Sequence, residues 1–318
     1  MNKNYIHRNS SLTDQQSFSE YLAPKFWPTW AFIGFLWCFT HLPFNVQLAL
    51  GRGVGWLAYH LAKSRRRVCA INIAKCYPEK SSEEQARLVK QVFLSYGQGM
   101  IETAMCWVRG KHYFEGKVEF EGIEHLDRAK EEGKGVLIVG GHFAILDLAG
   151  ALLSQIRDYD IVHRSHDNPL FNLYMTRSRE KYVTSCIARK DVRAMLKSLK
   201  QGRRLWYAPD QDYGRKESVF VPFFAVNEAA TTTGTEIFAG HKNAVTIPTK
   251  LRRLNGTQGY EIEFLSPLVD YPAADKETSA RQINAWVEQA VTDNMEQYMW
   301  VHRRFKTRPS PDAPSLYK

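Results

Sequence analysis

Short apolar runs alternate along this chain with stretches whose apolar residues recur every three or four positions. The run Val136 to Val139 is bounded by glycines, a pattern typical of a strand that is buried on both faces of a sheet. From Phe143 the apolar spacing changes to that of a helix. The same reading predicts further strands at Val118 to Glu121, Tyr159 to Val162, Leu205 to Ala208, Val245 to Lys250 and Tyr260 to Phe264.

Helical spacing fills most of the intervals between these strands. Ser81 and Glu84 form the sequence pattern of a capping box, and a long amphipathic helix is expected from there to about Val108. Shorter helices are expected at Glu124 to Glu132, Phe171 to Tyr182, Glu236 to His241 and about Ala280 to Tyr298. The alternation predicts an α/β fold, with a mixed sheet flanked by helices.

The N-terminal region has a different pattern. Residues 1–25 are polar and lack the features of a secretory signal, whereas residues 26–50 contain no Asp, Glu, Lys or Arg and are rich in aromatic residues. The stretch without proline, Thr29 to Leu42, is shorter than the roughly 20 residues that a spanning helix needs. We therefore expect a membrane-anchoring helix that either spans the bilayer or lies in its interface.

A basic cluster follows this segment, at Lys63 and residues 65–67. Such clusters favour the cytoplasmic face of a membrane. Residues 51–318 are accordingly predicted to form one cytoplasmic domain.

His142 comes directly after the glycines that end the central apolar run. Because residues five apart on one helix point in different directions, His142 must lie outside the helix if it is to meet Asp147. A carboxylate on one imidazole nitrogen leaves the other free to accept a proton from a hydroxyl group. The spacing equally allows a simpler reading, in which His142 caps the helix and Asp147 is an ordinary acid of its first turn.

Other polar residues also follow expected strands or lie on expected helices. Arg177 and Arg179 are suited to binding phosphate or carboxylate, although a surface salt bridge is the commoner role of an arginine. Asp210 and Asp212 lie in an acidic turn and could bind a metal ion, but no third ligand accompanies them. A hydroxyl-rich turn is expected at Ala229 to Thr235, before a helix that could receive an anion. Basic residues that recur every three or four positions predict a basic helix face; they are Arg189, Arg193, Lys197, Lys200 and Arg204.

Composition narrows the class of protein. With 318 residues and 44% apolar content the chain can bury a sizeable core, and its net charge of +10 suits an acidic partner such as nucleic acid, an anionic membrane or an acidic carrier protein. The five cysteines are widely spaced and include no CxxC pair, which indicates neither a disulfide framework nor a zinc site.

Taken together, the motifs resemble those of the bacterial lipid A biosynthesis late acyltransferases, most closely the lauroyltransferase branch. The resemblance covers nearly the whole chain and rests on blocks that occur in the family's order: NIAKCYPE, GGHFAILDLAG, HRSHDNPLFNLYMTRSR, WYAPDQDYGRKESVFVPFF with AATTTGT, and EQYMWVHRRFKTRP. The wider superfamily, which includes glycerol-phosphate acyltransferases and their fold, shares only the H-x-x-x-x-D/E element.

The resemblance implies transfer of a fatty acyl group from acyl carrier protein to a hydroxyl of the 3-hydroxyacyl chains of Kdo2-lipid IVA, at the cytoplasmic face of the inner membrane and without a metal or organic cofactor. It implies that His142 is the general base and Asp147 its orienting acid, although this branch usually has glutamate at the second position. Arg179 and Asp210 match functional positions outside that pair, and Arg164 is a candidate for binding the lipid head group.

Two rival functions remain open from the sequence. The first is an enzyme of the same superfamily that acylates glycerol phosphate or a lysophospholipid, which the H-x-x-x-x-D element alone supports. The second is a non-enzymatic protein that binds membrane surfaces or nucleic acid through its positive charge. No recognisable nucleic-acid-binding module is present, so a nucleic-acid partner is not expected.

Overall fold

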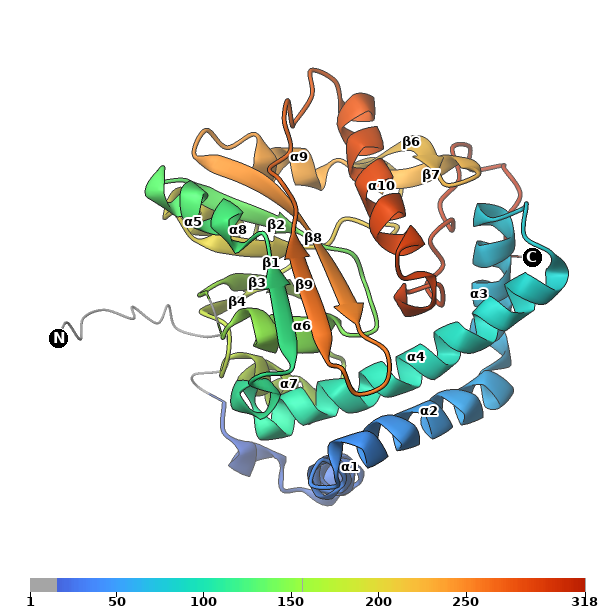
Figure 1. Ribbon diagram of the computed structural model, residues 1–318, viewed down its shortest axis with the longest axis vertical. Helices are drawn as coiled ribbons and strands as arrows, with labels where there is room; N and C mark the ends of the chain where they lie inside the picture. Colours follow the sequence, from blue (N-terminus) through green and yellow to red (C-terminus); the bar gives the residue numbers. More distant parts are fainter. Residues whose placement is uncertain (1–15, 156, 318) are drawn as a thin grey trace.

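The computed structural model describes residues 16–155 and 157–317, and a seven-stranded sheet lies at its centre (Figure 1). The strands lie in the order β1-β9-β8-β2-β5-β3-β4, and all neighbouring strands are parallel except β8 and β9. Their bounds are β1 (Val118–Glu121), β2 (Gly135–Val139), β3 (Asp160–His163), β4 (Ser185–Ala188), β5 (Arg204–Tyr207), β8 (Ala244–Arg253) and β9 (Tyr260–Phe264). The mixed sheet expected from the sequence is therefore confirmed.

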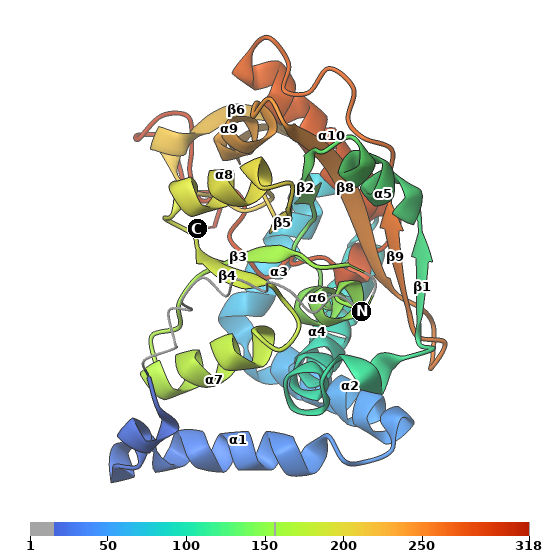
Figure 2. The ribbon, with the colours of Figure 1, turned by 90° about the vertical axis from the view of Figure 1, so that its left-hand side faces the viewer.

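Strand β2 occupies the middle of the sheet, and all of its residues are buried. This burial explains the continuous apolar run, because helices cover both faces of the sheet at this position. Figure 2 shows α5 (Ile123–Glu131), α8 (Val192–Lys200), α9 (Gly234–Ala239) and α10 (Lys276–Thr292) on one face. The opposite face is covered by α4 (Ser82–Arg109), α6 (Leu146–Leu153) and α7 (Pro169–Arg179). Single 3-10 turns occur at η1 (Phe18–Tyr21), η2 (Pro24–Phe26), η3 (Lys111–Phe114), η4 (Arg215–Glu217) and η5 (Met295–Gln297).

Several elements differ from the sequence-based expectation. The predicted turn at Ala229 to Thr235 is mostly strand, because its β-branched threonines belong to β7 (Val226–Thr232), which pairs with β6 (Ser218–Phe223). The predicted basic helix face is divided: Arg189 follows the unpredicted strand β4, and Arg204 begins β5. Helix α10 ends at Thr292, because the residues that follow turn back to contact the loop after β2.

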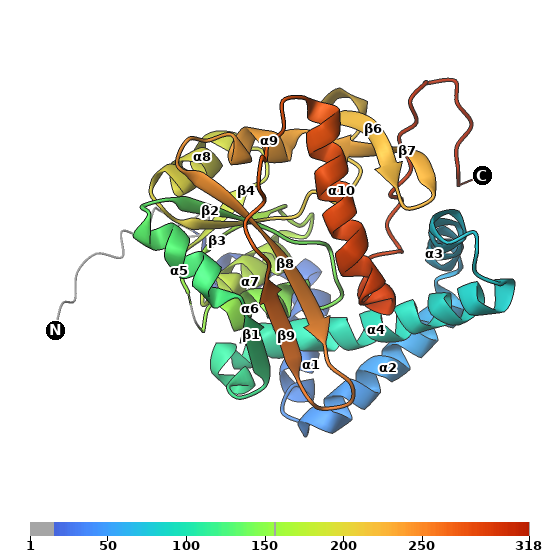
Figure 3. The ribbon, with the colours of Figure 1, turned by 45° about the horizontal axis from the view of Figure 1, so that its top comes forward.

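Helix α4 begins with the predicted capping box. The Ser81 hydroxyl accepts the backbone N–H of Glu84, whose carboxylate accepts the backbone N–H of Ser81. The helix then runs beneath the sheet and packs closely on α2 (Phe44–Leu61) (Figure 3). Gly97 permits this approach, since a Cβ atom there would lie 2.2 Å from the carbonyl oxygen of Gly51.

The expected anchor segment forms two helices. Helix α1 (Trp27–Phe39) is separated from α2 by a turn at residues 40–43, where Pro43 caps the second helix. Across residues 16–155 and 157–317, no helix combines the length and the apolar character needed to cross a membrane. Most of the predicted polar tail, residues 1–15, lies outside the described residues.

Helices α1 and α2 form an outer layer on the side away from α9 and α10 (Figures 1 and 2). Helix α1 contacts the body through Ile33, which packs with Leu170 and Leu173 of α7. Much of the remaining apolar surface of this layer is exposed: Trp27, Phe32, Phe35, Trp37, Leu42, Val46, Leu50, Val54, Trp56, Leu57 and Leu61. Helix α3 (Lys63–Cys76) then leads away from α2 toward the start of α4 (Figure 1).

Candidate active site

Two neighbouring parallel strands bring His142 and Asp210 together. Strands β2 and β5 are paired so that Val139 lies opposite Tyr207, the last residue of each strand. His142 and Asp210 each follow three residues later, so both side chains start from the same edge of the sheet. Open α/β sheets bind their ligands at this carboxyl edge.

The carboxylate of Asp210 holds His142 through both of its oxygens. Oδ1 of Asp210 lies 2.5 Å from Nδ1 of His142, and Oδ2 accepts the backbone N–H of His142 at 2.9 Å. Asp210 is buried, whereas the His142 side chain is 17% exposed. Nε2 of His142 makes no hydrogen bond with any residue in the described ranges. The arrangement fixes the imidazole orientation and leaves one ring nitrogen available to a ligand.

The same contact determines the charge state of the pair. Burial by itself would lower the pKa of His142, but the charge of Asp210 and the hydrogen bond to it outweigh burial, so the pKa lies above its ordinary value of 6.5. Burial would raise the pKa of Asp210, but the interactions with His142 keep that pKa below its ordinary value of 3.8. Asp210 is therefore an anion at neutral pH, which favours the positive form that His142 adopts after accepting a proton.

The C-terminal region closes around the His142 loop. Met299 N–H donates to the carbonyl oxygen of His142 at 3.0 Å, and Ala144 N–H donates to the carbonyl oxygen of Gln297 at 2.7 Å. Phe143 and Tyr298 lie opposite each other between these two bonds as an antiparallel bridge. We call residues 297–302 the closing segment, because it fixes the backbone on both sides of the catalytic candidate.

Buried polar contacts hold the closing segment in place. The side-chain amide of Gln297 exchanges two hydrogen bonds with the backbone of Arg253, whose guanidinium forms a buried ion pair with Glu102 of α4. At the other end of the segment, Nδ2 of Asn72 donates to the carbonyl oxygens of Trp300 at 2.6 Å and His302 at 2.7 Å. The sequence interpretation assigned these residues no role, although Asn72 and Gln297 lie in the blocks NIAKCYPE and EQYMWVHRRFKTRP.

Asp147 has a different partner from the predicted one. Its carboxylate forms a bidentate ion pair with Arg179 of α7, with oxygen-to-nitrogen distances of 2.7 and 2.9 Å, while His142 pairs with Asp210. The physical reason lies in the start of α6: this helix begins at Leu146 instead of Phe143, so Asp147 is in its first turn, beside α7. Burial would lower the pKa of Arg179, but Asp147 outweighs burial and raises it.

The other two predicted binding residues lie outside this cluster. Arg177 donates to the carbonyl oxygen of Gln16 and lies over the ring of Phe18, so it contacts the N-terminal segment. Arg164 is exposed in the loop after β3, and its guanidinium makes no hydrogen bond within residues 16–155 and 157–317. Of the six predicted site residues, the structure thus joins His142 with Asp210 and Asp147 with Arg179.

Backbone groups around His142 are largely occupied. The N–H groups of Phe143, Ala144 and Leu146 all donate to backbone carbonyl oxygens, so these three groups are not available to a ligand. The loop also rests directly on α4, because a Cβ atom on Gly99 would lie 2.2 Å from the carbonyl oxygen of Ala144. Among the described residues there is no group of three His, Cys, Asp or Glu side chains that could hold a metal ion.

An imidazole fixed by a buried carboxylate, at the carboxyl edge of a parallel sheet, is the arrangement of enzymes that use histidine as a general base toward a hydroxyl group. Comparison with known proteins identifies the family. The model of the bacterial lipid A biosynthesis acyltransferase family matches residues 15–307. The chain belongs to this family, and it is an acyltransferase that acts in lipid A biosynthesis.

Two relatives with similar sequences agree with this assignment. The chain is 40% identical over 307 residues to the lipid A biosynthesis lauroyltransferase of Escherichia coli, an alignment that covers 96% of this chain and 100% of the relative. It is 35% identical over 298 residues to the lipid A biosynthesis palmitoleoyltransferase of the same organism, with 94% and 97% covered. Among solved structures, it is similar to the 1-acyl-sn-glycerophosphate acyltransferase of Thermotoga maritima, with a TM-score of 0.38, 14% identity and coverage of 79% and 97%.

Proposed function

We propose that this protein transfers a fatty acyl chain, lauroyl or similar, from acyl carrier protein to a hydroxyl group on the 3-hydroxyacyl chains of Kdo2-lipid IVA. The observation that carries the proposal is the pair of His142 with the buried Asp210, in a chain of the lipid A acyltransferase family. A secondary hydroxyl is a weak nucleophile at neutral pH, and a positioned base supplies what such a reaction needs.

In the proposed reaction, Nε2 of His142 accepts the proton of the acceptor hydroxyl while the hydroxyl oxygen attacks the thioester carbonyl carbon. The tetrahedral intermediate then expels the thiolate of the carrier, which takes the proton back from His142. Asp210 does not touch the substrate in this scheme: it positions His142 and stabilises its positive form. We assign the orienting role to Asp210 and a structural role to Asp147, which joins α6 to α7 through Arg179.

We further propose that the protein is attached to the cytoplasmic face of the inner membrane through α1 and α2. Helix α1 is apolar around its whole circumference, yet Trp27, Phe35 and Trp37 are more than half exposed. A helix of this composition is normally buried, so its exposure calls for an apolar covering. Aromatic side chains are also those favoured at the interface of a bilayer, where the proposed acceptor lipid lies.

The assay that tests the proposed function is single-turnover acyl transfer in detergent. Labelled acyl carrier protein with acyl chains of several lengths is offered Kdo2-lipid IVA or lysophosphatidate as acceptor. Transfer to Kdo2-lipid IVA is expected, and the preferred donor identifies the chain length. Transfer only to lysophosphatidate would contradict the proposal and favour a phospholipid acyltransferase.

The proposed base predicts the pH dependence of this activity. Only neutral His142 can accept a proton, and its pKa is raised, so kcat/KM is expected to increase with pH through a transition above 6.5. The effect on stability has the opposite sign. A raised folded-state pKa stabilises the fold below the unfolded value, and this contribution is lost as pH rises through the folded value. Rate profiles and thermal unfolding across the same buffers check both trends, and an activity transition below 6.5 would exclude His142 as the titrating base.

The proposed membrane attachment predicts a second result. Replacing Phe35 and Leu57 by aspartate is expected to release the protein from phosphatidylcholine vesicles, since burying each apolar side chain contributes about 1.5–3 kcal/mol. In the matched control, Ile237 and Val269 are replaced by aspartate instead. They are also exposed apolar residues but lie outside α1 and α2, so this variant should still bind the vesicles. Vesicle sedimentation measures both variants, and equal binding by the two would argue against the attachment surface.

A further inference from the structure

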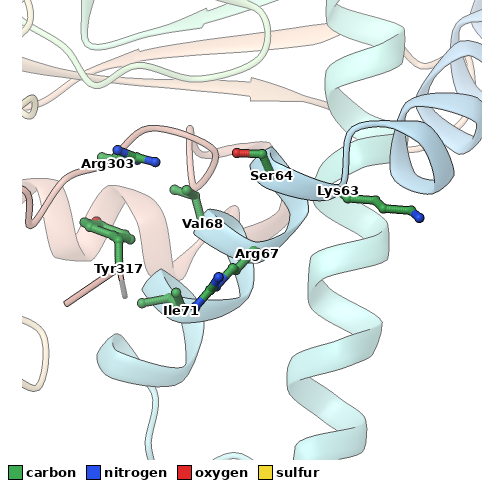
Figure 4. A pocket seen from close by; sticks show the side chains of 7 residues that line it. All are labelled: Lys63, Ser64, Arg67, Val68, Ile71, Arg303 and Tyr317. Atoms are coloured by element: carbon green, nitrogen blue, oxygen red, sulfur yellow. The ribbon is translucent and has the colours of Figure 1, made fainter. Parts of the chain in front are cut away.

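A cavity lies outside the catalytic candidate, between α3 and the C-terminal region (Figure 4). Its volume is about 310 Å³, and its walls are formed by Lys63, Ser64, Arg67, Val68, Ile71, Arg303 and Tyr317. In Figure 4 the Ser64 hydroxyl and the Arg303 guanidinium point toward one another, Arg67 lies along α3 beside Ile71, and the Lys63 ammonium points away. The cavity therefore combines two guanidiniums and a hydroxyl with an apolar floor.

The salt bridges of the described residues leave the cations of this cavity without an acidic partner. Within residues 16–155 and 157–317, Lys63, Arg67 and Arg303 form no salt bridge, and the only recorded side-chain contact of Arg303 is with the ring of Tyr317 at 5.9 Å. Arg67 of α3 and Arg303 of the C-terminal region are both exposed and both line this cavity, so it carries a positive charge. An anionic ligand in the cavity would supply a counter-charge for these side chains.

The wall opposite α3 is fixed before any ligand arrives. The Tyr317 hydroxyl donates to Oδ1 of Asn72 at 2.6 Å and accepts the backbone N–H of Phe305 at 2.9 Å. The same Asn72 holds the carbonyl oxygens of Trp300 and His302, so the cavity and the closing segment share one anchor. His302 in turn lies near enough to His142 and Asp210 for their charges to affect its pKa, which burial lowers overall.

The cavity also adjoins the exposed apolar layer. Leu61, the last residue of α2, is 71% exposed, and the cavity begins two residues later at Lys63. Ile71 lies eight residues further along α3, which is about 12 Å at the rise of an α-helix. The polar layer of a bilayer is about 5–8 Å thick on each side. If α1 and α2 rest in the membrane interface, the end of the cavity at Lys63 lies at the depth of the lipid head groups.

We propose that this cavity binds a phosphate monoester carried by a membrane lipid, with Arg67 and Arg303 contacting its oxygens and Ser64 donating a hydrogen bond. Guanidiniums bind phosphate through paired N–H groups, and a monoester carries more negative charge than a carboxylate. Val68, Ile71 and the ring of Tyr317 offer apolar contacts to the part of the lipid that bears the phosphate. This inference rests on the proposed membrane attachment but not on the proposed acyl transfer.

The test measures sedimentation of the full chain with vesicles, in the absence of any acyl donor. The vesicles contain phosphatidylcholine alone, or phosphatidylcholine with either phosphatidic acid or phosphatidylserine, mixed to equal surface potential. The native protein is expected to prefer phosphatidic acid over phosphatidylserine by roughly fivefold or more. Ser64→Ala, which keeps the net charge, is expected to reduce this preference, and the double substitution Arg67→Gln with Arg303→Gln should abolish it.

Lys75→Gln is the matched control, because Lys75 is exposed on the same helix but does not line the cavity. This variant is expected to keep the preference for phosphatidic acid over phosphatidylserine. If it lost as much of this preference as the cavity variants, general surface charge would explain the result and the proposal would be overturned. Binding of inorganic phosphate as tight as that of phosphatidic acid vesicles would overturn the lipid assignment. Unchanged binding of the variants to pure phosphatidylcholine would confirm that membrane attachment is intact. Failure of the phosphate site can thus be distinguished from failure of the proposed attachment through α1 and α2.

Discussion

Replacement of His142 by alanine is expected to lower the single-turnover rate of acyl transfer by about 10²–10⁴-fold, the contribution typical of a positioned general base. In free-energy terms this is about 3–5 kcal/mol of lost transition-state stabilisation. The physical reason is that Asp210 holds His142 through both of its carboxylate oxygens, so His142 is the imidazole that is oriented at this edge of the sheet. The loss should appear in kcat, while binding of the acceptor lipid is retained.

His112→Ala is the appropriate control for this variant. His112 is an exposed residue whose contact is with Glu115, three positions away, and its loss should leave the rate unchanged. Circular dichroism and thermal unfolding of His142→Ala are needed as well, because the substitution removes the ring partner of the buried carboxylate of Asp210. A folded His142→Ala protein with undiminished transfer would refute the mechanism.

Asp210→Asn is expected to have the second largest effect, a loss of about 10²-fold or more. The asparagine side chain has one acceptor oxygen, whereas Asp210 accepts from both the ring and the backbone N–H of His142. In this variant, either residue 210 loses one of its two contacts with His142, or the His142 ring adopts its other tautomer. Without the negative charge, burial dominates and the pKa of His142 should fall below its value in the native protein. NMR titration of the His142 ring provides this readout separately from activity.

Asp147→Asn separates the two acidic residues. Asp147 contacts Arg179, so this substitution weakens the link between α6 and α7 and leaves the His142 contacts in place. We expect a smaller rate loss than for Asp210→Asn, a lower melting temperature and an unchanged pKa transition in the rate profile. A fall in the pKa of His142 in the Asp147 variant alone would restore the pairing predicted from the sequence.

Much of the fold was accessible from the sequence because a parallel sheet covered on both faces leaves continuous apolar runs. The run at residues 136–139 became β2, and the predictions at Val118 to Glu121 and Tyr260 to Phe264 match β1 and β9. Strand β4 was missed because its residues, SCIA, form a run too short and too mixed to stand out. The threonine-rich β7 was read as a turn because hydroxyl residues are common in both settings.

The candidate site was harder to predict, since it depends on which strands are neighbours. His142 was identified from its position after the apolar run, but nothing in local spacing places β5, and with it Asp210, beside β2. The pairing of Asp147 with Arg179 likewise depends on the packing of α6 against α7. The resemblance to the family pointed to all four residues of these two pairs. Which of them contact one another was seen only in the three-dimensional structure.

The closing segment has a consequence for the biosynthesis of the protein. His142 emerges from the ribosome long before residues 297–302, which supply the backbone partners of the His142 loop. Until that segment has been translated, the carbonyl oxygen of His142 and the N–H of Ala144 lack the contacts that fix them. We therefore expect a nascent chain that has completed the sheet to remain inactive until residues 297–302 have emerged from the ribosome and packed against the His142 loop.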